Sequence, residues 1–147
     1  FIFLLSLLIV DGSDNADYFI YKFNISKKDQ RRLKIIDKFY EQKITAKSFS
    51  EKNLNKIFYF HGKEAVIDII GYRLFSLKKV DKNLLSLISL FKNKVLPTMP
   101  FGAKILMEKY DIPEGKTLGN KLKKIEENWV NNNFQLSEDQ INKIINN

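Results

Sequence analysis

The 147-residue sequence predicts an all-α fold without a sheet. Apolar residues recur at helical spacing along nearly the whole chain, and no segment alternates apolar and polar residues as a half-buried strand does. Turn and capping residues separate the periodic segments at short intervals. With 44% hydrophobic and 29% charged residues, three Pro and six Gly, the composition is that of a compact domain rather than a disordered tail.

Two short helices are predicted at the start. Residues 1–10 are apolar except for Ser6. They reach about half of the roughly 20 residues that a membrane-spanning helix requires, so we interpret them as a core helix and expect no membrane partner. Turn residues at 11–14 end this helix, and a second helix covers residues 14–23. The first residue is Phe1 rather than Met, so we expect a fragment of a longer product.

A longer helix is predicted for residues 26–42. Ser26 and Asp29 have the spacing of a capping box, which satisfies backbone N–H groups at a helix start. The inward face of this helix carries apolar residues at helical spacing, namely Leu33, Ile36, Phe39 and Tyr40.

Two further helices meet at His61 and Gly62. Ser50 caps the first of them, which carries the apolar residues Leu54, Ile57, Phe58 and Phe60. The second covers residues 63–77 and packs inward through Ala65, Ile69 and Ile70. A glycine between two periodic segments favours a break in the helix.

Asp81 is the predicted N-cap of the next helix, residues 82–95. Pro97 and Pro100 forbid its continuation, because proline lacks the backbone N–H that a helix interior needs. This proline step is the clearest joint in the chain.

The joint divides the chain into a helical body, residues 1–96, and a C-terminal tail, residues 97–147, which we expect to pack on the body as one compact unit. The tail begins with a short helix over residues 102–110. The strongest helix follows, and its apolar stripe consists of Leu118, Leu122, Ile125 and Trp129. Ser137 caps a terminal helix whose inward residues are Ile141, Ile144 and Ile145.

No catalytic machinery is recognisable in this sequence. Without Cys and with His61 as the single histidine, a disulfide, a Cys/His zinc site and a thiol nucleophile are excluded. No two acidic residues have the i, i+2 spacing of a strand-borne Mg²⁺ site, and Gly115 and Gly119 border a helix turn rather than form a phosphate loop. We interpret His61 as a capping or packing residue, and we expect no metal or cofactor in this chain.

The charge balance points toward an acidic partner. Lys and Arg number 25 against 17 Asp and Glu, which leaves a net charge of +8, and such an excess is typical of nucleic-acid binding. Lys34 belongs to the densest basic cluster, and four of its neighbours share one side of a helix that could follow a phosphate backbone. The candidate RNA-binding residues of this cluster are Lys27, Lys28, Arg31 and Arg32. Those of a second cluster are Lys116, Lys121, Lys123 and Lys124. Trp129 and the Phe residues, at helical spacing with Leu and Ile, are predicted to be core rather than base-stacking platforms.

A compositional origin of the charge is an alternative. Of the 25 basic residues only Arg31, Arg32 and Arg73 are arginine, and Ile and Asn are abundant while Ala is scarce. AT-rich codons produce this pattern without selecting an RNA-binding face. The chain would then be a non-catalytic helical protein-interaction domain with lysines on solvated faces.

Several motifs follow one another along the chain. The body holds Phe23-Asn24-Ile25-Ser26-Lys27-Lys28-Asp29-Gln30-Arg31-Arg32-Leu33 and His61-Gly62-Lys63-Glu64-Ala65. The tail holds Pro97-Thr98-Met99-Pro100-Phe101-Gly102-Ala103-Lys104-Ile105-Leu106-Met107, then Ile112-Pro113-Glu114-Gly115-Lys116-Thr117-Leu118-Gly119-Asn120-Lys121-Leu122, then Ile125-Glu126-Glu127-Asn128-Trp129-Val130. In this order they resemble the C-terminal region of bacterial CCA-adding tRNA nucleotidyltransferases and their poly(A) polymerase relatives. That family has a Leu-Ser-Asn-x-Asp-Arg-x-Arg-Leu segment, a Tyr-Arg-x-Gly-x-x-Ala helix start, a Pro-x-x-Gly-x-Asp-Leu turn and a Gly-Pro-x-x-Gly-x-x-Leu helix that often ends in Trp-Ile or Trp-Val.

The resemblance implies a cytoplasmic helical body and tail that hold tRNA or another RNA. In the family, an N-terminal head adds nucleotides from CTP and ATP with Mg²⁺. The head carries a Gly-Ser opening, an Asp-x-Asp metal pair, an Arg-Arg-Asp motif and a Glu-Asp-x-x-Arg template. This sequence contains none of the last three, and its one Gly-Ser pair, Gly12-Ser13, is not followed by an Asp-x-Asp pair. Lys104 also stands where the family usually has Asp, and Glu114-Gly115-Lys116 replaces Gly-Pro. We therefore expect RNA binding without catalysis by this chain alone, with a separate catalytic head polypeptide as a further partner.

Overall fold

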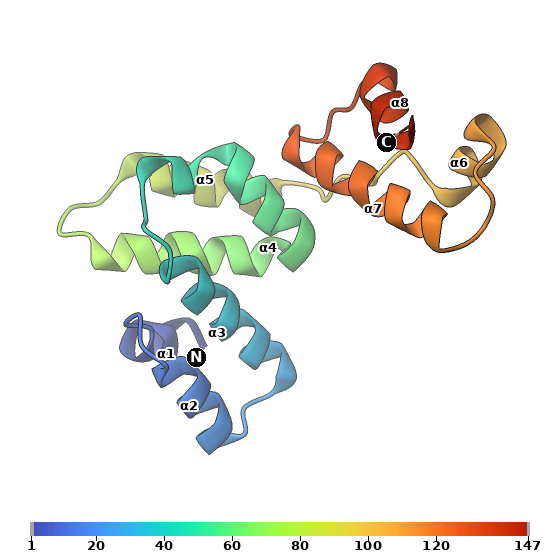
Figure 1. The fold of residues 1–147 in the computed structure, drawn as a ribbon. Coiled ribbons are helices and arrows are strands. Elements are labelled where there is room, and N and C mark those ends of the chain that lie inside the picture. Colours follow the sequence, from blue (N-terminus) through green and yellow to red (C-terminus); the bar gives the residue numbers. More distant parts are fainter. Residues whose placement is uncertain (1, 147) are drawn as a thin grey trace. The chain divides into compact units, whose positions relative to one another are not determined.

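The computed structural model describes residues 2–146, and within that range all regular secondary structure is helical (Figure 1). The predicted all-α fold is confirmed for this part of the chain. The elements are α1 (Ile2–Ile9), α2 (Asn15–Phe23), α3 (Lys27–Tyr40), a short 3₁₀ helix η1 (Ala46–Phe49), α4 (Glu51–Ser76), α5 (Lys82–Asn93), α6 (Ala103–Tyr110), α7 (Lys116–Asn131) and α8 (Glu138–Asn146).

The chain divides into two compact units, Phe1–Val95 and Leu96–Asn147. The division falls between Val95 and Leu96, close to Pro97, where the sequence cannot continue a helix.

The helix starts follow the predicted caps. The Ser26 Oγ accepts a hydrogen bond from the backbone N–H of Asp29 at 3.2 Å, and the Ser50 Oγ accepts one from Asn53 at 3.4 Å. The Asp81 carboxylate accepts bonds from two backbone N–H groups at the start of α5. Each cap pairs a donor that a helix leaves unsatisfied in its first turn.

Helix α4 consists of two helical segments that meet at Gly62. The backbone of Gly62 has φ 85° and ψ 176°, which lies outside the helical region and which glycine adopts without a Cβ clash. The chain changes direction sharply there (Figure 1), as the sequence predicts. Leu54 and Phe58 of the first segment are buried, whereas Phe60 is 52% exposed.

Two apolar clusters make up the core of the first unit. One lies where α4 packs on α5, and its buried residues are Leu54, Phe58, Val66, Ile70, Leu84 and Phe91. The other joins α1, α2 and α3 to the second segment of α4, and its buried residues are Val10, Ala16, Leu33, Ile36 and Ile69. The Tyr40 hydroxyl donates to the Ile69 carbonyl at 2.7 Å across this second cluster. These contacts hold α3 against α4.

The second unit has one small core of its own. Its buried residues are Leu106, Ile112, Leu118, Ile125 and Ile141. Trp129 is 3% exposed and packs edge to face on Phe134, with ring centroids 5.0 Å apart. The prediction that Trp129 is a core residue is therefore confirmed.

The short helix η1 was not predicted from the sequence. Its start is held by the Thr45 backbone N–H, which donates to the Ser48 Oγ at 3.1 Å.

A second result concerns the apolar first helix. Among residues 2–146, no helix combines the length and the hydropathy needed to cross a bilayer.

Candidate nucleic-acid interface

A groove runs between α3 and α4 in the first unit. It consists of two adjoining hollows with volumes of about 360 Å³ and about 460 Å³. Ile35 and His61 line both hollows, so they mark the point where the two meet. The groove is bordered by the four candidate RNA-binding residues of the first cluster, namely Lys27, Lys28, Arg31 and Arg32.

Helix α3 turns one row of basic residues outward. Lys27, Arg31, Lys34 and Lys38 lie at i, i+4, i+7 and i+11, so they share one face, and all four are exposed. The Lys34 Nζ lies 2.8 Å from the Asp17 carboxylate, but both side chains are mostly in water, where such a pair holds weakly. Within residues 2–146, the other three form no ion pair. We call Lys27, Arg31, Lys34 and Lys38 the outer row.

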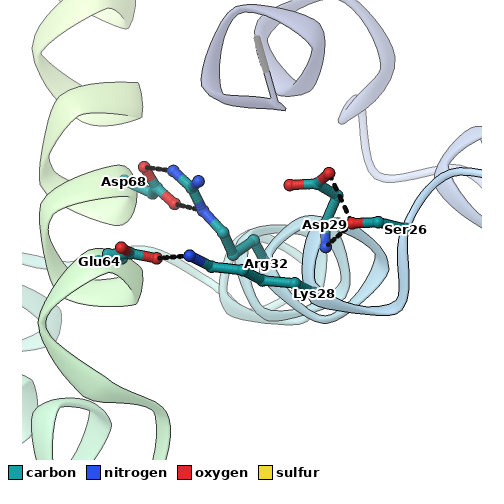
Figure 2. Close-up of polar contacts among 6 residues, drawn as sticks. All are labelled: Ser26, Lys28, Asp29, Arg32, Glu64 and Asp68. Carbon is teal, nitrogen blue, oxygen red and sulfur yellow. Dashed lines mark hydrogen bonds and ion pairs between the residues drawn. The ribbon is translucent and has the colours of Figure 1, made fainter.

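The other two basic residues of α3 point toward α4 and form an inner row. The Arg32 guanidinium donates two hydrogen bonds to the Asp68 carboxylate, Nε to Oδ2 and Nη2 to Oδ1, each 2.8 Å long (Figure 2). The Asp68 side chain is only 6% exposed. The hydrogen bonds that Arg32 donates to Asp68 outweigh the effect of burial and raise the pKa of Arg32. Arg32 therefore holds α3 to α4, and its donors toward Asp68 are occupied.

Lys28, also in the inner row, is held much less firmly. Its Nζ lies 3.3 Å from the Glu64 Oε2, with the two side chains 71% and 57% exposed (Figure 2). An exposed pair of this kind contributes about 0–1 kcal/mol and is screened by salt. Lys28 can therefore leave Glu64 and bind a phosphate with only a small loss of free energy.

The first turn of α3 adds to the positive field. Ser26 donates its hydroxyl to the Asp29 carboxylate at 2.7 Å while it accepts from the Asp29 backbone N–H (Figure 2). This cap fixes the turn that carries Lys27 and Lys28. Cations at the positive end of a helix dipole are locally unfavourable, so they do not stabilise α3.

The groove also has residues that the sequence analysis did not select. Lys38 lines the larger hollow, and so does Lys56 from the first segment of α4. Extending the i+4, i+7, i+11 series along α3 would have found Lys38, whereas Lys56 reaches the groove only through tertiary packing. His61 is exposed and lines both hollows rather than lying in the core. Burial and then the charge of Lys38 lower the pKa of His61, so it is neutral at pH 7.

The basic residues of α7 belong to the second unit. Successive residues rotate by about 100° around a helix, so Lys116, Lys121, Lys123 and Lys124 spread over about 160°, the same arc that the outer and inner rows of α3 cover together. The Lys121 Nζ donates to the Ile145 carbonyl near the end of α8. One of the four thus has a structural partner within its own unit.

No metal site accompanies the groove in the part of the chain that the structure describes, where no group of three or more His, Asp or Glu side chains could hold an ion. Comparisons with protein-family models, with curated proteins and with solved structures found no match.

Proposed function

We propose that this chain binds RNA through the α3–α4 groove, as the RNA-binding C-terminal portion of a CCA-adding or poly(A) nucleotidyltransferase. One observation supports the RNA-binding part of this proposal. The groove is lined by seven cationic side chains, of which Arg32 is paired with Asp68, and by a single carboxylate, that of Glu64. The seven are Lys27, Lys28, Arg31, Arg32, Lys34, Lys38 and Lys56.

The outer row has the dimensions of a phosphate-tracking surface. From Lys27 to Lys38 the helix rises about 16 Å, at about 1.5 Å per residue, which is enough to pass several phosphates. Three of its four cations have no ion pair within residues 2–146, so a phosphate would displace only water and counterions. If codon composition alone supplied the lysines of α3, exposed lysines would also be expected on faces of this helix that lie away from the groove. The fourth exposed lysine of this helix, Lys28, also lines the groove.

The family assignment rests on the ordered set of motifs in residues 97–134, to which the segments around Ser26 and His61 add support. Because the head motifs are absent from this sequence, the proposed role is to hold RNA, and Mg²⁺ with ATP or CTP would belong to a separate head. We expect the purified chain with Mg²⁺ to incorporate no labelled ATP or CTP into tRNA. Magnesium-dependent incorporation would contradict this assignment.

A helical protein-interaction domain is the second candidate. It is favoured by large apolar side chains that stay in water on α1 and α2: Leu8 is 82% exposed and Tyr21 is 85% exposed. Where such side chains form a contiguous patch, the patch is typical of a surface that binds another protein. This candidate predicts no preference for RNA over other polyanions.

The decisive experiment compares two triple variants of equal charge in the first unit. Lys27→Gln, Arg31→Gln and Lys38→Gln remove outer-row cations, whereas Lys78→Gln, Lys79→Gln and Lys82→Gln remove exposed lysines outside the groove. Binding of labelled tRNA is measured by fluorescence anisotropy. We expect the outer-row variant to lose about tenfold or more in affinity and the control to lose much less. Equal losses, or equal affinity for tRNA and heparin, would favour the interaction domain.

A further inference from the structure

We propose that the groove binds single-stranded RNA and that the larger hollow receives one unstacked base. This inference rests on the proposed RNA-binding function and names the form of RNA. It follows from a difference between the two hollows that share Ile35 and His61. One is dominated by charge, whereas the other has an apolar interior with cations around it.

The larger hollow has the walls of a base site. Its volume of about 460 Å³ lies within the range of small-molecule sites. The apolar residues that line it are Ile35, Phe39, Ile44, Ile57 and Ile69. Apolar walls do not stabilise a bound phosphate, whereas they stabilise the flat face of a nucleobase through contact and stacking.

Phe39 supplies an aromatic ring whose position is already fixed. It packs edge to face on Tyr40, at 5.2 Å between centroids, and on Phe49 of η1, at 5.6 Å. Because neighbouring rings hold it, little conformational entropy is lost when a base contacts it. Polar side chains in the same lining can meet the edge of a base: Gln42 is exposed, and the Asn53 amide donates one bond at 2.8 Å to the Lys47 carbonyl, which leaves its side-chain oxygen as an acceptor.

The cations around the hollow fit the phosphates on either side of such a base. Lys34, Lys38 and Lys56 all line it, and the first two belong to the outer row that continues to Lys27. A strand that follows this row would therefore bring its bases to the apolar walls. Bases paired in an A-form duplex cannot reach them, because stacking and pairing keep them inside the helix.

The test uses three labelled RNA probes, of which the two single strands have equal numbers of phosphates and the duplex has more. They are a single strand of about ten nucleotides, the same strand with abasic sites throughout, and a duplex. We expect the intact single strand to bind the full chain about fivefold to a hundredfold more tightly than either of the others, the range that one base contact supports.

A matched pair of variants locates the base. Ile44→Ser removes an apolar wall residue that belongs to neither core cluster of the first unit, whereas Val80→Ser alters an exposed loop residue outside the groove. Ile44→Ser should weaken binding of the intact strand and leave the abasic strand unchanged, and Val80→Ser should change neither. Thermal unfolding checks that both variants fold.

The outcomes separate this inference from the proposed function. If the abasic strand or the duplex binds as tightly as the intact strand, and salt weakens all three, the base site is refuted while RNA binding stands. If no probe binds in a salt-dependent way, both the base site and the proposed RNA-binding function are refuted. The comparison of wild-type chain with intact and abasic strands decides the matter even if Ile44→Ser does not fold.

Discussion

Helices α3 and α7 both carry dense runs of basic residues, and those of α3 line a groove that α4 completes. In α3 the spacing i, i+4, i+7, i+11 produces the outer row, and the facing helix supplies Lys56 and His61. In α7 the Lys121 Nζ donates to the Ile145 carbonyl of its own unit, and Glu126 and Glu127 follow the lysines in sequence. A basic cluster in sequence therefore indicates a binding surface only when its members share a face that another element completes.

A second contrast lies within α3 itself. Arg31 and Arg32 are neighbours in sequence and look equivalent there. Their side chains differ by about 100° in direction: Arg31 is exposed, and Arg32 bonds the buried Asp68. The first is suited to a phosphate, and the second stabilises the packing of α3 on α4.

The largest expected effect concerns the buried side chain of Trp129 in α7. Trp129→Ala should lower the free energy of unfolding by about 3–5 kcal/mol, because the side chain is 3% exposed and its removal leaves a cavity. Thermal unfolding followed by circular dichroism measures this. The control Tyr21→Ala alters an 85% exposed ring and should stay within about 0.5 kcal/mol.

This variant also tests whether α3 or α7 carries RNA binding. If the groove of the first unit carries RNA binding, Trp129→Ala should keep most of its affinity under conditions where the first unit stays folded. A loss of affinity without any change in unfolding would contradict both the buried role of Trp129 and the placement of the binding site.

The next largest effect separates the two arginines. Arg32→Ala leaves the buried Asp68 carboxylate without its partner and should lower the free energy of unfolding by about 3 kcal/mol. Arg31→Ala should change it by less than about 0.5 kcal/mol and instead weaken RNA binding. Chemical denaturation measures the first effect and anisotropy the second.

A double variant tests the cause of the Arg32 effect. Replacing the pair by apolar residues of similar size, Arg32→Met with Asp68→Leu, should restore much of the lost stability, because neither side chain then needs a charged partner. If the double variant is as unstable as Arg32→Ala, the bidentate pair is not what joins α3 to α4.

The sequence predicted the helices well because their signals are local. Ser26, Ser50 and Asp81 cap helices through bonds to residues two or three positions away, and Gly62 breaks α4 through its own backbone. Such interactions are encoded in adjacent residues. The short helix η1 was missed because it is a single turn held by Thr45 and Ser48 without apolar periodicity.

The site was predicted only in part, because tertiary contacts decide it. Sequence spacing selected the basic residues of α3, yet it could not show that Asp68 lies 36 positions after Arg32 and binds it. Nor could it show that Lys56 and His61 of α4 complete the groove. These relations depend on how α3 packs on α4, and the pattern within one helix does not contain that information.

Salt dependence compares α3 and α7 directly. For each phosphate contact removed, the slope of log affinity against log salt should flatten by about 0.7–0.9. Lys27→Gln, Arg31→Gln and Lys38→Gln together should flatten it by about 2, whereas Lys116→Gln, Lys123→Gln and Lys124→Gln should flatten it by less than about 1. Equal changes would show that the charge acts through composition rather than through the groove.

The smallest expected effect is a pH dependence that arises at His61. Its pKa lies below the ordinary value of about 6.5, first because burial disfavours the imidazolium and then because Lys38 repels it. As the pH falls through this lowered pKa, His61 gains a charge and the groove gains one cation. RNA affinity should therefore rise modestly on acidification, as anisotropy at constant ionic strength would show.

Two features make this last prediction specific. A lowered pKa in the folded state means that the contribution of His61 to stability is present above about pH 6.5 and is lost as the pH falls, so tighter folding cannot explain stronger binding. His61→Gln should abolish the step, and Lys38→Gln should move it to higher pH because the repulsion is removed. A step that persists in His61→Gln would assign the pH dependence to another group and would leave His61 outside the RNA-binding surface.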